Sequence, residues 1–312
     1  MDYHVTFPKL GLEFDLNTTA FSFGDFSVGW YGVIIGCGFL LAIAYALHSC
    51  KKMNINADHL LDAILVGVVA GIIGARLYYV IFYPGDTYRK DPMQIFNIMA
   101  GGLGIYGGII AGLGAGALVA RWRRLSVPAV LDVAVLGFLI GQGIGRWGNF
   151  VNQEAFGSPT DLPWGMVSEG TGMVAVHPCF LYESIWCFTG FLLLHFFTRK
   201  WRRYDGQTFL LYLLWYGTGR FFIEALRTDS LYIDLFVVEL KVSQLVALVT
   251  VAAALLLLFV LRRRTVLSGC GHRRIMDLNA IHDDLPVAEA AEADAEEETV
   301  PEDDGDANDS DE

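Results

Sequence analysis

Seven apolar runs, each near the length needed to cross a bilayer, constrain the fold of this chain more than any other feature. About 20 apolar residues are needed to span a hydrocarbon core of about 30 Å. The runs are Val28–His48, Leu60–Phe82, Ile95–Ala120, Val130–Gly145, Phe180–Thr198, Phe209–Ala225 and Val242–Leu261. We therefore predict an all-α integral membrane protein with seven transmembrane helices. The fourth run is short because it leads directly into a polar stretch.

The basic residues predict the orientation of these helices. Four clusters follow the first, third, fifth and seventh runs: Lys51 and Lys52; Arg121, Arg123 and Arg124; Arg199, Lys200, Arg202 and Arg203; and Arg262, Arg263 and Arg264. The opposite connections contain only Lys9, Arg89, Lys90, Arg227 and Lys241. The positive-inside rule then places the N-terminus outside and the C-terminus in the cytoplasm. Residues 1–27 become an outer-side segment, and residues 28–264 a membrane domain with an outer-side insert at 150–176.

The C-terminal tail, residues 265–312, has a different composition. Sixteen of the 34 acidic residues lie from Asp277 onward, where there is no Lys or Arg, so the rest has 18 acidic residues against 22 basic ones. We predict that the tail is disordered from about Asp277, because it is acidic and poor in aromatic residues. The basic residues lie in short clusters beside apolar runs, which does not indicate nucleic-acid binding. The five cysteines show no metal or disulfide spacing, and we expect no metal or cofactor.

Three arginines, Arg76, Arg146 and Arg220, fall within or at the edge of predicted spans, toward the outer half of the bilayer. Such an arginine costs about 2.5 kcal/mol or more on insertion scales, so its presence indicates a function unless it only snorkels to the interface. Arg146, Asn149 and Gln153 recur at helical spacing, which predicts one cation and two amides on one face. A guanidinium fork with amides suits a phosphate or carboxylate oxygen.

The sixth run has a second polar face. Tyr216, Arg220, Glu224 and Arg227 recur at spacings of four, four and three residues, which places them along one side of a helix. One interpretation is an Arg220–Glu224 pair that only neutralises itself inside the bundle. The tyrosine and the second arginine favour the other interpretation, a site for an anionic headgroup.

Other polar residues also lie close to apolar runs. Tyr106 lies within a glycine-rich segment that permits either close helix packing or a broken helix lining a cavity. His177 precedes a proline at the start of the fifth run, where it could be purely structural, and Glu183 lies just inside that run. Asp132 near the inner end of the fourth run could cap that helix.

Six separated motifs, in order, resemble those of the prolipoprotein diacylglyceryl transferase family. They are Trp30-Tyr31-Gly32; Gly74-Ala-Arg76-Leu-Tyr-Tyr; Gly101-Gly-Leu with Tyr106-Gly-Gly; Gly145-Arg146-Trp-Gly-Asn149-Phe-Val-Asn152-Gln-Glu154-Ala-Phe-Gly157; His177-Pro with Leu-Tyr182-Glu183; and Arg220-Phe-Phe-Ile-Glu224 with Arg227. The resemblance covers residues from about 28 to 264. It implies a seven-span enzyme of the bacterial inner (plasma) membrane that needs no cofactor.

The resemblance also implies the reaction and its residues. The enzyme would transfer the diacylglyceryl group of phosphatidylglycerol to the lipobox cysteine of a prolipoprotein signal peptide and release glycerol phosphate. The implied catalytic residues are Arg146, Arg220, Tyr106, Asn149 and Glu224. The implied substrate-binding residues are Arg146, Tyr31, Arg76, Asn152, Glu154, Gly157, His177, Tyr182, Glu183, Tyr216 and Arg227.

One departure from the family pattern concerns Tyr106. Many members have a histidine at this position, and it has been treated as a catalytic base. A phenol is a poor base at neutral pH, so we expect Tyr106 to position the lipid by a hydrogen bond. Two alternatives to an enzyme remain: an anion or lipid transporter, and a lipid-binding protein without catalysis. Apart from Asp132 the inner halves of the runs are nearly free of charge, which favours the enzyme.

Truncation after Arg274 is expected to leave the rate of lipid transfer unchanged. The acidic tail cannot form a packed core, and the predicted topology places it across the membrane from the outer arginines. Product formation by the purified truncated and full-length proteins, compared at equal amounts of inserted protein, measures this. A large loss of specific activity in a well-inserted truncation would show a catalytic or assembly role for the tail.

Overall fold

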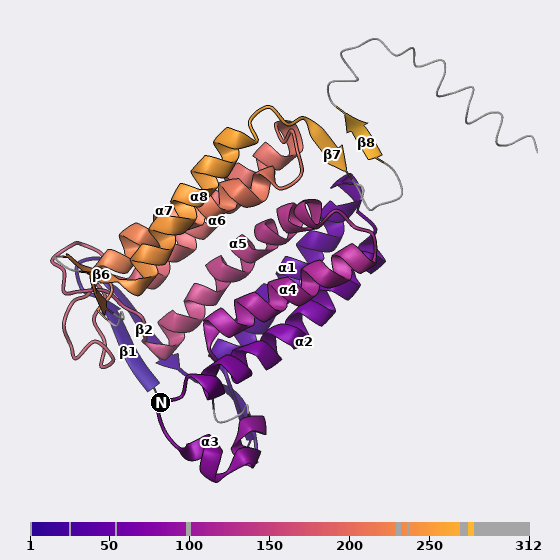
Figure 1. The fold of residues 1–312 in the computed structure, drawn as a ribbon. Helices are drawn as coiled ribbons and strands as arrows, with labels where there is room; N and C mark the ends of the chain where they lie inside the picture. Colours follow the sequence, from indigo (N-terminus) through magenta and orange to yellow (C-terminus); the bar gives the residue numbers. More distant parts are fainter. Residues whose placement is uncertain are drawn as a thin grey trace, which may run out of the picture.

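Long helices account for most of the described chain, which comprises residues 2–24, 26–53, 55–97, 101–228, 232–235, 238–268 and 274–277 of a computed structural model. The long helices are α1 (Trp30–Cys50), α2 (Ala57–Ile81), α4 (Ile105–Trp122), α5 (Val127–Asn152), α6 (Cys179–Lys200), α7 (Gln207–Leu226) and α8 (Val242–Val260). They lie side by side in one bundle with α5 near its centre (Figure 1). The all-helical prediction for the membrane domain is confirmed. The acidic tail after Asp277 lies outside the described residues.

Six of these helices are long and apolar enough to cross a membrane by length and composition. The helix outside this set is α7, which contains the charged residues Arg220 and Glu224 together with two glycines and two tyrosines. A multi-pass arrangement is therefore supported by six helices. The count of seven spans stays a prediction.

Two helix boundaries differ from those predicted by more than three residues. The helix expected from Ile95 begins only at Ile105, because Gly101 and Gly102 have φ values of 83° and 75°, which a right-handed helix excludes. The preceding residues form a short 3₁₀ helix, η2 (Pro92–Phe96). Conversely, α5 does not stop at Gly145 but continues through Arg146 to Asn152. Arg146 is therefore held on a regular helix.

Glycines allow α2 and α4 to pack with their backbones in contact. A Cβ atom added to Gly74 would lie 2.7 Å from the carbonyl oxygen of Gly107, and one added to Gly67 would lie 3.0 Å from that of Gly112. Small residues at a helix interface permit this approach where there is no water to drive association. Of the two meanings open for the glycine-rich segment, close packing is observed along α4.

The remaining helices pack around α5, which contacts α1, α6 and α7, and α8 packs on α7. At the end of the bundle opposite the insert, Asp132 of α5 is fully buried. Its carboxylate accepts hydrogen bonds from the backbone N–H groups of Gly206 and Phe209, both at 2.8 Å, and from Nη1 of Arg202 at 3.2 Å. The idea that Asp132 caps its own helix is therefore wrong, because it caps the N-terminus of α7.

A small head is formed by the N-terminal strands and the insert between α5 and α6. Two antiparallel hairpins pair β1 (Asp2–Phe7) with β2 (Leu12–Asn17), and β3 (Thr19–Phe23) with β4 (Phe26–Gly29). Thr6 of β1 exchanges backbone hydrogen bonds with Val167 of the insert. Apolar residues from both segments and from the adjoining ends of α5 and α6 form one core: Val5, Phe7, Phe150, Met166, Val176 and Phe180.

The shorter elements lie in the connections between the helices. They are η1 (Lys51–Met53), α3 (Thr87–Lys90), the hairpin of β5 (Tyr232–Leu235) with β6 (Val238–Lys241), and the hairpin of β7 (Val266–Ser268) with β8 (Arg274–Asp277). The β5–β6 hairpin joins α7 to α8, so it brings the end of β6 back to the end of α7.

Gly74→Ala is expected to destabilise the bundle, although alanine is the better helix former. The added methyl group would meet a backbone carbonyl that cannot move aside, and overpacking of this kind typically costs about 1–3 kcal/mol. Thermal unfolding of the purified protein in detergent measures the loss. Gly114→Ala is the matched control, because a Cβ atom there meets nothing within 4 Å. Equal melting temperatures for the two variants would contradict the role of the glycine contact.

Candidate functional site

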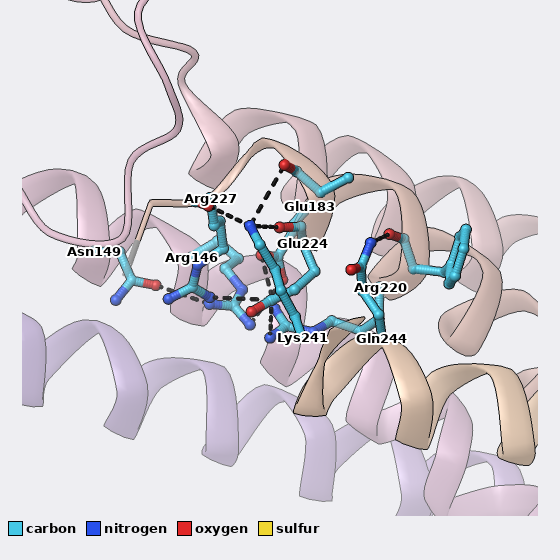
Figure 2. A network of polar contacts seen from close by, with 10 residues as sticks. Arg146, Asn149, Glu183, Arg220, Glu224, Arg227, Lys241 and Gln244 are labelled. Atoms are coloured by element: carbon cyan, nitrogen blue, oxygen red, sulfur yellow. Dashed lines mark hydrogen bonds and ion pairs between the residues drawn. The ribbon is translucent and has the colours of Figure 1, made fainter. Parts of the chain in front are cut away.

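Two arginines from different helices share one buried carboxylate where the ends of α5, α6 and α7 meet. Arg146 Nη2 of α5 lies 2.7 Å from Glu183 Oε2, and Arg220 Nη1 of α7 lies 3.1 Å from Glu183 Oε1. Glu183, in the second turn of α6, is 4% exposed. Figure 2 shows the two guanidinium groups converging on this carboxylate. Glu183 therefore holds both forks in fixed positions relative to each other.

The polar face predicted for α7 is present and extends this network. Arg220 Nη2 lies 2.5 Å from Glu224 Oε2, and Arg227 Nη1 lies 3.9 Å from the same oxygen. Residues three and four apart on a helix are neighbours, which explains these contacts. The Arg220–Glu224 pair is thus one part of a cluster built by three helices and does not stand alone.

Lys241 adds a further cation that sequence analysis did not include in the site. It ends β6 and is 7% exposed, and its ammonium group donates a hydrogen bond of 2.7 Å to the main-chain carbonyl of Glu224 and another to that of Arg227 (Figure 2). These carbonyls end α7, where a cation is favoured by the helix dipole. No spacing along the chain indicates this contact, because the β5–β6 hairpin brings Lys241 back to α7.

The charges of this cluster favour an anion. Arg146, Arg220, Arg227 and Lys241 supply four positive charges, and Glu183 and Glu224 supply two negative charges. The side chains of Arg146 and Arg220 are 22% and 20% exposed, so they are partly accessible. An excess of positive charge in a partly buried place strengthens charge-assisted hydrogen bonds to an added phosphate or carboxylate.

The C-terminal turn of α5 provides amide groups beside Arg146. Asn149 Oδ1 accepts a hydrogen bond of 3.2 Å from Arg146, and Asn149 Nδ2 donates one of 2.9 Å to Glu154 Oε1. The half-buried Asn152 makes no side-chain hydrogen bond within the described chain. The prediction that Gln153 lies on the same helical face as Arg146 and Asn149 is wrong. Gln153 follows the helix with φ 51°, and its buried side chain accepts a hydrogen bond from the Ser168 hydroxyl at 2.6 Å.

Two of the predicted site residues, Tyr31 and Gly157, lie at close contacts that only a glycine permits. Tyr31 of α1 packs on Gly148, where a Cβ atom would lie 2.7 Å from its ring. Gly157 lies between the start of α6 and the end of α7, and a Cβ atom there would lie 2.7 Å from His177 Cβ and 3.1 Å from the Leu226 carbonyl oxygen. Gly157 N–H donates to the His177 carbonyl at 2.9 Å. Only glycine permits the insert to pass this closely between the two helices.

Aromatic and imidazole groups connect the insert to α6. Trp164 Nε1 donates a hydrogen bond of 2.7 Å to Tyr182 Oη, which also lies 3.2 Å from His177 Nδ1. Tyr216, one turn before Arg220 on α7, stacks on Tyr212 with ring centroids 5.6 Å apart. Apart from Tyr216, which lies one turn further into the bundle, the residues singled out between 146 and 227 therefore occupy one end of the α5–α7 unit.

Arg76 and Tyr106 occupy a different part of the bundle. Arg76 is 5% exposed, and its guanidinium donates to the main-chain carbonyls of Gln94, Ile95, Gly101 and Gly102 at 2.6 to 3.0 Å. The half-exposed Tyr106 ring lies 6.3 Å from that of Tyr78. Within the described ranges, no hydrogen bond or ion pair joins either residue to Arg146 or Arg220. Arg76 therefore connects η2 with Gly101 and Gly102, which precede α4.

Comparison with known proteins gives a consistent assignment. The family model described as prolipoprotein diacylglyceryl transferase matches residues 18–260. A phosphatidylglycerol–prolipoprotein diacylglyceryl transferase of Clostridioides difficile is 39% identical over 241 residues, which cover 77% of this chain and 94% of the relative. Proteins of the same name from Finegoldia magna and Bacillus mycoides are 41% and 40% identical, covering 78% and 81% of this chain and 94% and 95% of the relatives.

Proposed function

Because the chain belongs to the prolipoprotein diacylglyceryl transferase family, we propose that it transfers the diacylglyceryl group of phosphatidylglycerol to a prolipoprotein cysteine thiol, the first step of lipoprotein maturation. The sulfur forms a bond to the glyceryl carbon, and the bond between that carbon and the phosphate oxygen breaks. Glycerol phosphate leaves as a phosphate monoester. The thiol proton balances the additional negative charge of this product.

The observation that carries the assignment of the site is the carboxylate shared by Arg146 and Arg220. The two guanidinium groups bind the lipid phosphate, with Asn149 and Arg227 at the edges of the same cluster. Negative charge develops on the departing phosphate during the reaction, and fixed cations stabilise such a charge without having to reorganise. Glu224 also orients Arg220, because it pairs with Nη2 of the guanidinium while Glu183 pairs with Nη1.

The remaining site residues have supporting roles in this proposal. Tyr182 and His177 hold the insert over the cluster, and Gly157 allows its close passage. Tyr31, Asn152, Glu154 and Tyr216 line the approach of the lipid or of the peptide. Arg76 acts indirectly, since its contacts to the segment before α4 hold Tyr106 in position.

The proposed topology has seven spans, with the N-terminus outside and the C-terminus in the cytoplasm of a bacterial cell membrane. The arginine cluster then lies toward the outer leaflet, where a lipobox cysteine reaches it on the outer side of the signal peptide's span. The head formed by residues 1–27 and the insert 150–176 lies on the same side. The positive-inside distribution of the basic clusters supports this orientation.

An anion transporter is the less favoured alternative, because it needs a polar path through the whole bundle. Asp132 is the charged residue predicted for the inner half of the bundle. Its carboxylate accepts hydrogen bonds from Arg202 and from the N-terminal backbone of α7. It therefore forms part of a helix cap and not of a path for an anion.

Arg146→Ala is expected to lower transfer by at least about a hundredfold while leaving insertion intact, since removal of one preorganised stabilising group commonly costs that much. Arg146→Lys is also expected to be impaired, because a point charge cannot replace the bidentate fork. Transfer to a lipobox peptide, measured by mass of the thioether product, is the assay. Arg123→Ala is the control, because Arg123 forms a half-exposed pair with Asp62. Normal turnover by Arg146→Ala would refute the phosphate assignment.

Tyr106→Phe is expected to slow transfer by a factor between a few and about a hundred, as for loss of one hydrogen bond to a neutral or charged acceptor. The pH–rate profile should stay parallel to that of the unmodified enzyme, because a positioning group does not titrate in the reaction. A loss of more than about a thousandfold, together with loss of the rising limb, would instead identify Tyr106 as the general base.

A further inference from the structure

A short column of polar side chains extends from the arginine cluster into the bundle. Gln142 lies four residues before Arg146 on α5, and Tyr216 lies four residues before Arg220 on α7. Four residues of an α-helix correspond to about 6 Å along its axis. Gln142 and Tyr216 therefore lie one turn deeper along their helices than the backbone of Arg146 and Arg220, on the side away from the insert.

The contacts within this column leave one polar atom unsatisfied. Gln142 Nε2 donates a hydrogen bond of 2.9 Å to Tyr212 Oη, and the ring of Tyr212 stacks on that of Tyr216 with planes inclined by 10°. The other end of the amide, Gln142 Oε1, is buried and has no hydrogen-bond partner among the residues that the structure describes. Buried carbonyl oxygens without a donor are uncommon in folded proteins, and each one requires an explanation.

We propose that Gln142 Oε1 accepts the S–H group of the prolipoprotein cysteine, so that Gln142 and Tyr212 form the subsite for the acceptor thiol. This inference rests on the proposed function. The thiol is a weak hydrogen-bond donor, and an amide oxygen held in place by Tyr212 can orient it without removing its proton. Gln142 is thus a positioning residue for the acceptor.

The geometry of the reaction favours the cysteine thiol, over the other hydrogen-bond donors of the two substrates, as the group that Gln142 Oε1 accepts. In a displacement at carbon the incoming sulfur approaches opposite the departing oxygen. With the phosphate on Arg146 and Arg220, the reacting carbon lies on the lipid side of the phosphate. The sulfur then lies still deeper, at the level of Gln142. The hydroxyl groups of the glycerol headgroup are on the other side of the phosphate and do not reach this atom.

The test measures recognition of the thiol separately from transfer. The full-length protein in phosphatidylcholine nanodiscs, without phosphatidylglycerol, is titrated with two fluorescent lipobox peptides that differ only by alanine in place of the cysteine. The unmodified protein is expected to bind the cysteine peptide about two- to tenfold more tightly, as for one weak to ordinary hydrogen bond. Gln142→Leu is expected to reduce this ratio to about one while binding the alanine peptide as before.

Two further variants complete the design. Gln207→Leu, at the opposite end of α7, is expected to prefer the cysteine peptide over the alanine peptide by the same factor as the unmodified protein. If Gln142→Leu does not fold, Gln142→Asn takes its place, because the shorter amide withdraws Oε1 and retains its polarity. A ratio of one in the unmodified protein, or an unchanged ratio in a folded Gln142 variant, would overturn the subsite. Failure of the proposed function would appear differently, as peptide discrimination without lipid transfer when phosphatidylglycerol is added.

Discussion

The carboxylate of Glu183 is the group on which the candidate site depends. It is almost fully buried and meets a guanidinium from α5 on one oxygen and a guanidinium from α7 on the other. A buried carboxylate needs such partners, because desolvation of an unpaired charge costs several kcal/mol. The same contacts prevent Arg146 and Arg220 from taking the many rotamers open to a free arginine. The two guanidinium groups are therefore preorganised by contacts within the protein.

The packing of α6 against α7 maintains this arrangement. The indole N–H of Trp186 donates to the carbonyl of Trp215, and the indole N–H of Trp215 donates to the carbonyl of Trp186, both at 3.0 Å. The two rings stack with centroids 4.3 Å apart, and Gly190 and Gly219 leave the space for them. This reciprocal pair fixes the register of the two helices, and with it the position of Glu183 relative to the arginine of α7.

Two packed groups of helices contain the two sets of polar residues. In the first, α2 and α4 meet through glycines, and Arg76 is bound by main-chain carbonyls before Tyr106. In the second, α5 to α8 hold the charged cluster and its capping lysine. Phosphate binding by the second group and positioning by the first would bring residues from distant parts of the chain to one lipid.

The sequence alone determined the helices and the charged face of α7. Apolar runs of sufficient length predict helices wherever they occur, and the spacing of Arg220, Glu224 and Arg227 fixes their common face, since helical geometry depends only on nearby residues. The order of the motifs indicated the family. These features are local, or can be read along the chain, and they were confirmed.

Only the tertiary structure decided which polar groups meet. Arg76 looked equivalent to Arg146, yet its donors are occupied by carbonyls of the segment before α4. Lys241 looked like an ordinary loop residue, yet it caps α7, and Gln153 left the predicted face because the helix ended one residue earlier. The physical reason is common to all three. A buried polar side chain is fixed by the donor or acceptor that faces it, and that partner belongs to a segment brought there by packing.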